Sequence, residues 1–224
     1  MNNLTIENGY LYGYLGDGGG RLGGSAIYSS RPNITLNSVT LSGGASKEYS
    51  DGSVQISVLG GVLHASYSIV ALHDCVFSSN YGIGSYYTNG VYGGAIYGLS
   101  STFPLEKCTL SSNAASGYHS NTYGGAFFCS KSTARIKSTT FSSNTASSNS
   151  GGLGYGGGLY IQESNVTSTG SYFTGNVASY SANDVYIESG RFQVEECPAG
   201  TSGSSVGYLS SNTGNFDNYE CTAL

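Results

Sequence analysis

The sequence predicts an all-β protein, a right-handed, single-stranded parallel β-helix of about six coils. Three observations predict it. A motif of glycines followed by one small and one apolar residue recurs at intervals of 31 to 36 residues. A second motif follows the first at a fixed distance, and the units are rich in Gly, Ser, Thr and Tyr. A repeat of this length is the signature of a solenoid, in which each unit stacks on its neighbours.

The small residue after the glycines defines position zero of each coil. It is found at Ala26, Val62, Ala95, Ala126 and Gly158. Position fifteen is always Leu or Phe, at Leu41, Phe77, Leu110, Phe141 and Phe173. Position eighteen is Gly44 in the first coil and Asn afterwards, at Asn80, Asn113, Asn144 and Asn176. The distance to the next position zero varies, so one half of the coil is rigid and the other is a loop of adjustable length.

The rigid half shows the alternation of short strands. Positions one and eight are always apolar and position ten is nearly so, and strand alternation places eight and ten on one face. Positions thirteen and fifteen share the next face, so a bend must separate the two strands. We expect that bend at Asn37, Asp74, Lys107, Ser138 or Gly170. Each coil should therefore hold two or three short strands, whereas a helical solenoid would need apolar spacing near 3.6 and better helix formers.

Stacking places like residues in internal rows. Phe77, Leu110, Phe141 and Phe173 are expected to form one continuous buried stack. The asparagines at position eighteen are expected to form an amide ladder, because each amide can donate to and accept from its neighbours. Gly44 would leave that ladder open at its upper end. The β-helix is assigned to residues 1–197, and residues 198–224 to a cap or a linker toward a Cys-rich module.

The combination of the two motifs resembles the repeat of the chlamydial polymorphic outer membrane protein (Pmp) family and its relatives among surface proteins. Gly-Gly-Ala-(Ile/Leu/Val) is matched at residues 93–96, with a Phe variant at 124–127 and a Gly variant at 156–159. Phe-x-x-Asn is matched at 77–80, 141–144 and 173–176, with a Leu variant at 110–113. The resemblance implies a right-handed parallel β-helix and a surface-exposed, often adhesive, passenger. It transfers no catalytic residues.

Composition excludes several classes of function. Charged residues make up 9% of the 224 residues, and a net charge of −5 with 8 Lys+Arg argues against a nucleic-acid groove. No apolar run approaches a membrane span, and the first residues lack the features of a signal peptide. We therefore expect an excised piece of a larger secreted protein, located outside the cell or on its surface. The chain starts in mid-coil at Leu4, and such open ends could stack on a copy of the chain to give fibres.

The cysteines lie at positions 75, 108, 129, 197 and 221. Cys75 and Cys108 share position thirteen in adjacent coils, close enough for a disulfide, although both also fit as fillers of an internal row. Cys197 and Cys221 are candidates to close the tail. No metal site or cofactor is expected, because Cys-x-x-Cys and paired His spacings are lacking. Glycosylation sequons begin at Asn3, Asn33 and Asn165.

The candidate binding surface is the outward row at position two. Its members are Tyr28, His64, Tyr97, Phe128, Tyr160 and Tyr186. Stacked aromatic residues on an outer face suit contacts with glycans or with other surface proteins. In the alternative interpretation, the adjacent loop folds over the row and covers it.

Two other classes of function compete with an extracellular structural or adhesive module. A carbohydrate-active enzyme would need clustered carboxylates, but the 13 acidic residues are dispersed, so no catalytic residue is expected. Asp74 beside Lys107, with Arg135 and Lys137 a coil further on, is interpreted as a solvated polar strip. An ice-binding solenoid would need a regular Thr ladder. The outward rows at positions fourteen and sixteen pair Thr with Ser, but Val76 and Tyr172 interrupt them.

Overall fold

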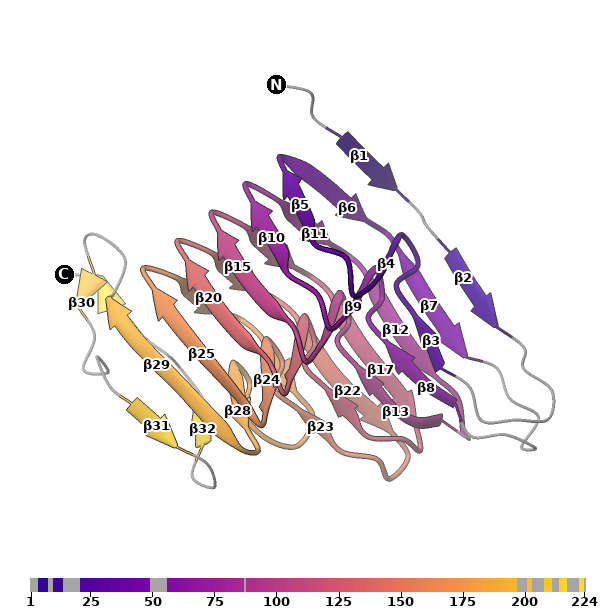
Figure 1. Cartoon of the computed structure of the whole chain (residues 1–224). Coiled ribbons are helices and arrows are strands. Elements are labelled where there is room, and N and C mark those ends of the chain that lie inside the picture. Colours follow the sequence, from indigo (N-terminus) through magenta and orange to yellow (C-terminus); the bar gives the residue numbers. More distant parts are fainter. Residues whose placement is uncertain are drawn as a thin grey trace.

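The chain folds as a parallel β-helix in the computed structural model (Figure 1). The structure describes residues 4–7, 10–13, 21–48, 56–86, 88–196, 201–202, 208–210, 214–216 and 222–223, and it describes side chains over 23–48, 56–86 and 88–195. All secondary structure in these residues is strand, and the strands are joined mainly by parallel pairing with the next coil. The prediction of an all-β solenoid is confirmed.

The described strands form five parallel sheets, A to E, which each coil visits in that order. Sheet A contains β1 (Leu4–Glu7), β6 (Val39–Ser42), β11 (Val76–Ser78), β16 (Thr109–Ser111), β21 (Thr140–Ser142) and β26 (Tyr172–Thr174). Sheet B contains β2 (Tyr10–Gly13), β7 (Ala45–Glu48), β12 (Tyr81–Gly84), β17 (Ala114–Tyr118), β22 (Thr145–Asn149) and β27 (Val177–Ala178). Sheet C contains β3 (Arg21–Gly23), β8 (Ile56–Leu59), β13 (Thr88–Tyr92), β18 (Thr122–Tyr123) and β23 (Gly154–Tyr155).

The remaining two sheets carry the glycine motif and the strand that follows it. Sheet D contains β4 (Ile27–Ser30), β9 (Leu63–Ser66), β14 (Ile96–Leu99), β19 (Phe127–Ser130), β24 (Leu159–Gln162) and β28 (Val185–Ile187). Sheet E contains β5 (Ile34–Asn37), β10 (Val70–His73), β15 (Thr102–Glu106), β20 (Thr133–Lys137), β25 (Ser164–Thr169) and β29 (Gly190–Glu196). The predicted two or three strands per coil are thus too few, because the variable half also forms strands, in sheets B and C.

The coil count also differs slightly from the predicted six. Between Ile27 and Tyr155 the structure describes four coils with a strand in every sheet, from β4–β8 to β19–β23. Partial coils flank them on both sides. At one of these ends the short strands β31 (Tyr208–Ser210) and β32 (Gly214–Phe216) pair antiparallel with β29 and β28. Strands β30 (Thr201–Ser202) and β33 (Thr222–Ala223) pair antiparallel with each other.

The bends between sheets are set by residues in the left-handed backbone region. Asp74, Lys107, Ser138 and Gly170 have φ between 47° and 57° and turn the chain from sheet E into sheet A, as predicted. In the first described coil the bend is at Ser38, with φ 54°, and the prediction of Asn37 is wrong by one residue. Asn37 is the last residue of β5, and Ser38 is the true position twelve of that coil.

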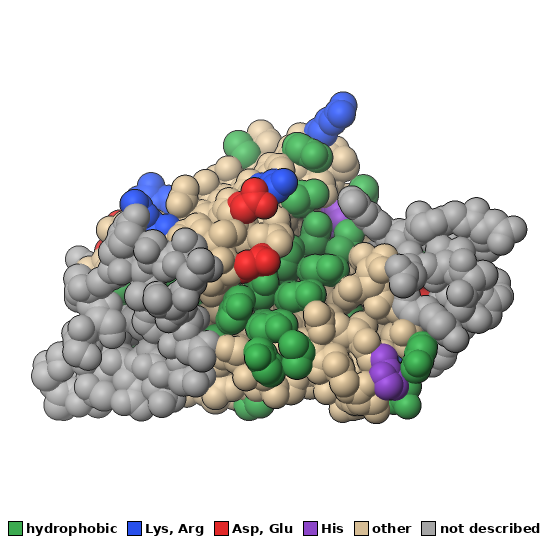
Figure 2. Space-filling model, turned by 90° about the horizontal axis from the view of Figure 1, so that it is seen from below, with side chains coloured by type: hydrophobic (Ala, Val, Ile, Leu, Met, Phe, Trp, Pro, Cys, Tyr) green, Lys and Arg blue, Asp and Glu red, His purple; other side chains and the backbone are tan. Residues whose placement is uncertain are grey.

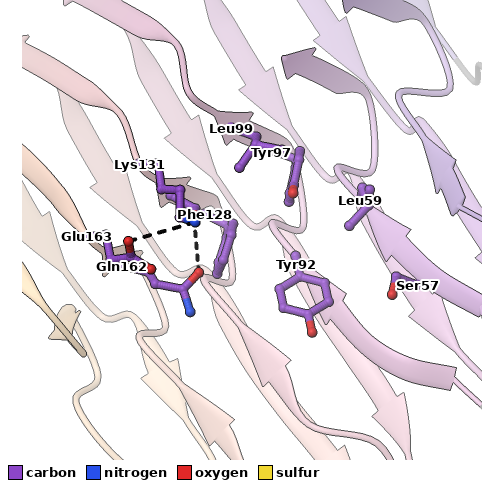
Figure 3. A pocket seen from close by; sticks show the side chains of 10 residues that line it. Ser57, Leu59, Tyr92, Tyr97, Leu99, Phe128, Lys131, Gln162 and Glu163 are labelled. Carbon is purple, nitrogen blue, oxygen red and sulfur yellow. Dashed lines mark hydrogen bonds and ion pairs between the residues drawn. The ribbon is translucent and has the colours of Figure 1, made fainter. Parts of the chain in front are cut away.

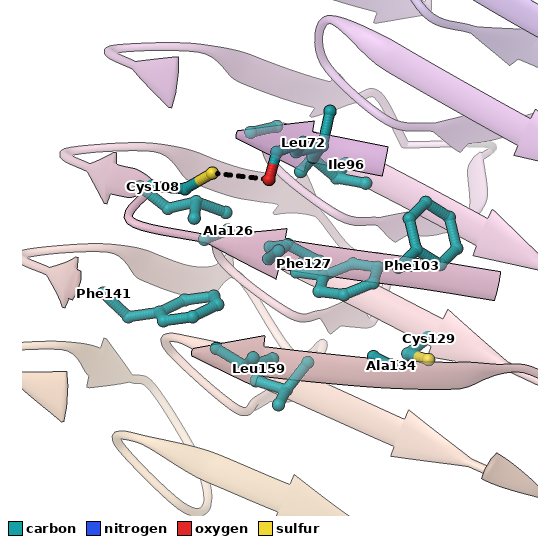
Figure 4. Close-up of a cluster of buried hydrophobic side chains, with 14 of the residues drawn as sticks. Leu72, Ile96, Phe103, Cys108, Ala126, Phe127, Cys129, Ala134, Phe141 and Leu159 are labelled. Carbon is teal, nitrogen blue, oxygen red and sulfur yellow. Dashed lines mark hydrogen bonds between the residues drawn. The ribbon is translucent and has the colours of Figure 1, made fainter. Parts of the chain in front are cut away.

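The core is a column of apolar side chains that stack coil on coil. Strand register aligns Leu41, Phe77, Leu110, Phe141 and Phe173, and each is at most 6% exposed. The Phe141 and Phe173 rings stack at 4.6 Å. The predicted internal stack is confirmed, and Figure 4 shows Phe141 in its place in this core beside Phe127 and Leu159.

The asparagine ladder is also confirmed, at the corner between sheets A and B. The Asn113 side-chain oxygen accepts from the backbone N–H and the amide of Asn80, and its Nδ2 donates to Asn144 Oδ1 and to the Phe77 carbonyl, at 3.0–3.1 Å. Asn176 ends the row by donating to Asp184 Oδ1 at 2.7 Å. At the other end the Gly44 N–H donates to Asn80 Oδ1. Each amide therefore ties two coils together and uses both its nitrogen and its oxygen to do so.

A second polar ladder, which the repeat pattern did not predict, runs along position six at the corner between sheets D and E. Ser68, Ser101 and Ser132 each bind the hydroxyl of the next serine through the backbone N–H, at 2.9–3.0 Å, and the row ends at Ser164. Each hydroxyl donates to the carbonyl two residues earlier. Serine recurs at this position in the sequence, but its abundance elsewhere masks the pattern.

Candidate functional site

The predicted aromatic row lies on the outer face of sheet D. Strand register stacks Tyr28, His64, Tyr97, Phe128, Tyr160 and Tyr186 in successive coils, as the sequence predicts. Neighbouring rings along the row are 4.7–5.4 Å apart. Exposure changes sharply along it. Tyr28 is 65% exposed, whereas Tyr97, Phe128 and Tyr160 are buried at 3–7%.

A second aromatic row covers the first, and it comes from sheet C. Tyr92, Tyr123 and Tyr155 directly precede the glycine motif of three successive coils, and their rings stack at 4.9 and 5.7 Å. They meet the first row edge-on, since the Tyr92–Phe128 and Tyr123–Tyr160 ring centroids are 5.0 Å apart at 73° and 77°. The expectation of a covering segment is thus correct in part, because the cover is a tyrosine strand and not a folded-over loop.

The two rows pack together along the corner between sheets C and D, and the surface that they form is here called the aromatic groove. It contains a pocket of about 400 Å³ whose lining includes Tyr92, Tyr97 and Phe128 (Figure 3). Its rim is polar, with Ser57, Ser130 and Gln162, and with Lys131 and Glu163, whose side chains lie 3.8 Å apart. On the face seen from below, hydrophobic side chains form a band with a few acidic and basic side chains along one border (Figure 2).

Three phenols of the groove have raised pKa values. Burial raises the pKa of Tyr155, with the neighbouring tyrosines adding to the effect. Burial also raises the pKa of Tyr160 and Tyr186, and the negative charge of Glu188 raises both further. These three tyrosines therefore stay uncharged at neutral pH.

The predicted cysteine sites are resolved only in part. Cys75 and Cys108 are buried free thiols, each donating to a carbonyl two residues earlier and to one in the preceding coil. They occupy an inward row with Thr139 and Ser171, which make the same kind of bond. The structure therefore shows the row-filling alternative and no disulfide between this pair. Cys197 and Cys221 lie outside the described residues.

Two of the three sequon asparagines can be placed. Asn33 and Asn165 are both exposed, and they occupy equivalent positions just before the inward apolar residue of sheet E. The Asn33 side-chain oxygen accepts from the Ile69 N–H at 3.3 Å. Asn3 lies outside the described residues.

The charged residues of the predicted polar strip lie on and beside the outer face of sheet E. Glu106 lies 3.4 Å from Lys137 and 3.7 Å from His73, and Arg135 stands on the same strand as Lys137. Asp74 and Lys107 sit at the following bend and are exposed. Within the described residues, no three His, Cys, Asp or Glu side chains are grouped so that they could hold a metal ion. Nor does any described helix have the length and apolar character needed to cross a membrane.

The Thr and Ser rows lie side by side on sheet A. Register aligns Thr40, Val76, Thr109, Thr140 and Tyr172, with Ser42, Ser78, Ser111, Ser142 and Thr174 beside them. The interruptions at Val76 and Tyr172 thus fall within one stacked row.

No protein-family model, curated protein or solved structure matches this chain. The resemblance to Pmp-type repeats therefore stays a prediction that rests on the two motifs.

Proposed function

We propose that this chain is a structural and adhesive module of an extracellular or cell surface, and that its aromatic groove binds a neutral glycan chain lying along the solenoid axis. The β-helix supplies a rigid scaffold, and each coil adds one residue to the first aromatic row. No catalytic step is part of the proposal.

The aromatic groove carries the proposal. The second row gives three successive coils a half-buried phenol each, at Tyr92, Tyr123 and Tyr155. The spacing between equivalent groups equals the strand spacing of about 4.8 Å, which gives a regular row of hydroxyl groups. A ligand that is itself a regular row of hydroxyl groups matches this surface, because each phenol can donate to it and accept from it.

The charge of the groove favours a neutral ligand over an acidic or basic one. Lys131 and Glu163 pair with each other at the rim, and Tyr155 and Tyr160 stay protonated because burial raises their pKa values. A charged ligand would lose hydration without gaining an opposite charge in the groove. The loss of hydration costs a neutral glycan less free energy, because hydrogen bonds to protein hydroxyls replace its hydrogen bonds to water.

The enzyme alternative has less support. A glycosidase site places two carboxyl groups on opposite sides of the bond to be cleaved. Glu163 is engaged with Lys131, and Glu188 contributes its charge to the environment of Tyr160. The ice-binding alternative requires an unbroken flat row, and the row on sheet A contains Val76 and Tyr172.

An array of neutral, uronate-bearing and sulfated oligosaccharides tests the proposal. We expect binding to a subset of the neutral oligosaccharides and no preference for the charged ones. The double variant Tyr123→Phe/Tyr155→Phe removes two hydroxyls and keeps both rings, so we expect affinity to fall at least about tenfold while the protein stays folded. The matched control is Tyr81→Phe/Tyr118→Phe, at two exposed tyrosines of sheet B.

Three outcomes would contradict the proposal. The first is no binding to any oligosaccharide on the array. The second is binding that follows negative charge, which would direct attention to the cationic side chains of sheet E. The third is equal loss of affinity in the groove variant and in the sheet B control, which would place the contact elsewhere. Capture of a protein partner through the groove would replace the glycan with a protein ligand.

A further inference from the structure

One end of the aromatic groove differs from its middle. Beside β4 and β9, a separate pocket of about 240 Å³ is lined by Gly23, Tyr28, Ser30, His64, Ser66, Tyr67 and Leu99. It is called here the end pocket. It holds two exposed rings, since Tyr28 is 65% and Tyr67 62% exposed. No charged side chain is among its lining residues.

Ring faces are available only where stacking ends. Tyr97 is stacked between His64 and Phe128, and Tyr123 between Tyr92 and Tyr155, so these rings offer edges to a ligand. Tyr28 makes one stacking contact among the described rings, with His64 at 4.7 Å and 25°. A flat apolar ligand surface can therefore pack on the exposed rings of Tyr28 and Tyr67 in the end pocket, whereas Tyr97 and Tyr123 have neighbours on both ring faces.

The backbone conformation of Tyr67 is energetically unfavourable. Its φ of 53° lies in the left-handed region, which is unfavourable for a bulky side chain. The equivalent bend residues of the other coils are polar or charged, at Arg31, Ser100, Lys131 and Glu163. An aromatic ring at this bend that is 62% exposed gives little hydrophobic stabilisation in return. Strain combined with exposure indicates that the ring serves binding.

Polar groups surround the two rings. The His64 ring, itself buried, bonds through Nε2 to Ser66 Oγ at 2.8 Å, and strand register places Ser30 directly beside Ser66. This combination of ring faces with hydroxyl and imidazole groups suits a pyranose. One face of a pyranose carries C–H groups that pack on an aromatic ring, and its rim carries hydroxyls that bond to polar side chains. The pocket is smaller than the ~300–1000 Å³ of drug-sized sites, so it fits one sugar ring and not a chain.

We propose that the end pocket binds a single pyranose ring, the terminal sugar of the glycan, with the sugar packed on the rings of Tyr28 and Tyr67. This inference rests on the proposed function and assigns the end of the chain that the aromatic groove holds. It predicts that affinity in the end pocket depends on the identity of the terminal sugar, whereas affinity in the aromatic groove depends on the length of the glycan.

Fluorine NMR of protein labelled with 3-fluorotyrosine tests the proposal, with methyl glucoside, methyl galactoside and methyl mannoside as probes. The resonances of Tyr28 and Tyr67 are assigned by their disappearance in Tyr28→Phe and Tyr67→Asn. We expect at least one glycoside to shift both resonances saturably and to leave that of Tyr172, an exposed tyrosine of sheet A, unchanged. Affinity should fall at least about tenfold in Tyr67→Asn.

Tyr67→Asn also separates binding from folding, because Asn tolerates the left-handed region better than Tyr. We expect its thermal stability to equal or exceed that of the wild type while glycoside binding is lost. The matched control Tyr172→Asn should keep full glycoside affinity.

The proposal is overturned if no glycoside shifts the resonance of Tyr28 or Tyr67 while neutral oligosaccharides still bind the protein and shift the resonances of the groove tyrosines. In that case the proposed function stands and the end pocket is not part of it. Failure of both oligosaccharides and glycosides would overturn the proposed function as well. Retention of glycoside affinity in folded Tyr67→Asn would also overturn the assignment of this ring.

Discussion

Two corners of the same coil use stacked side chains for opposite purposes. Between sheets A and B the asparagines point inward, and every amide hydrogen bond is made within the protein. Between sheets C and D the aromatic residues point outward, and Tyr92, Tyr123 and Tyr155 remain half-buried. Stacking therefore produces a closed structural ladder in one corner and an open surface in the other. The direction of a side chain in the coil decides which.

Truncation of the inner stack should give the largest effect on stability. Phe141 is fully buried and is stacked against Phe173 at 4.6 Å. Phe141→Ala is expected to lower the free energy of unfolding by about 3–5 kcal/mol, because the fixed coils on both sides prevent collapse of the cavity. Its neighbour on the same strand, Thr140, points outward, and Thr140→Ala should change the free energy by less than about 0.5 kcal/mol. Urea denaturation measures both, and similar losses would show that the inner stack is misplaced.

Breaking the asparagine ladder should give the next largest effect. Asn113→Ala removes the amide that binds the Phe77 carbonyl and the oxygen that binds Asn80. We expect a loss of about 2–4 kcal/mol, because buried polar groups are left without partners. Ser111→Ala, on the outer face of the same corner, is the control and should be almost neutral. A neutral Asn113→Ala would mean that water or a neighbouring group satisfies the ladder.

Alkaline titration should detect the buried phenols of the corner between sheets C and D. Burial raises the pKa values of Tyr155 and Tyr186, so the folded state holds these phenolic protons more tightly than the unfolded state. Their stabilising contribution is fully present below the unfolded pKa of about 10 and is lost as pH rises through the higher folded values. We expect stability to fall above about pH 10. Part of the ultraviolet absorbance of phenolate should therefore appear only at higher pH, because Tyr155 and Tyr186 lose their protons late. Titration of every tyrosine near the pKa of a free phenol would contradict the burial of these two side chains.

The smallest expected effect concerns the chemical reactivity of the buried thiol of Cys129. Burial raises the pKa of Cys129 to about 12, and this side chain is fully buried. A thiol-reactive maleimide at neutral pH should therefore leave Cys129 unmodified in the native protein and react with it after denaturation. Peptide mass spectrometry reads the site of modification. Rapid native labelling of Cys129 would place it outside the core.

The fixed half of the repeat makes most of the fold predictable. The constant spacing between position zero and position fifteen is enough to align Phe77, Leu110 and Phe141, and the asparagine ladder follows in the same way from position eighteen. The bend predicted at Asn37 failed by one residue, because the first coil offers two adjacent small polar residues, Asn37 and Ser38. Sheets B and C were missed, since their strands lie in the part of the repeat whose length varies.

Only part of the candidate site could be predicted from the sequence. The position-two row followed from strand alternation after the glycine motif, but its burial did not. Tyr92, Tyr123 and Tyr155 recur immediately before that motif, so a signal was present in the sequence. Its direction could not be derived, because the variable loop before these residues gives no register from which inward and outward positions can be counted. Tyr67 was missed because its left-handed backbone conformation and its exposure are not encoded in the repeat pattern.

One paired measurement tests the central claim that the outer stack serves binding and the inner stack serves folding. Affinity for the best neutral oligosaccharide and the free energy of unfolding are measured together for Tyr123→Phe/Tyr155→Phe and for Phe141→Leu. The account predicts at least about tenfold weaker binding with nearly unchanged stability in the groove variant. It predicts a clear loss of stability with unchanged affinity in the core variant, measured well below its unfolding temperature. A groove variant that keeps full affinity, or a core variant that loses binding while folded, would contradict the account.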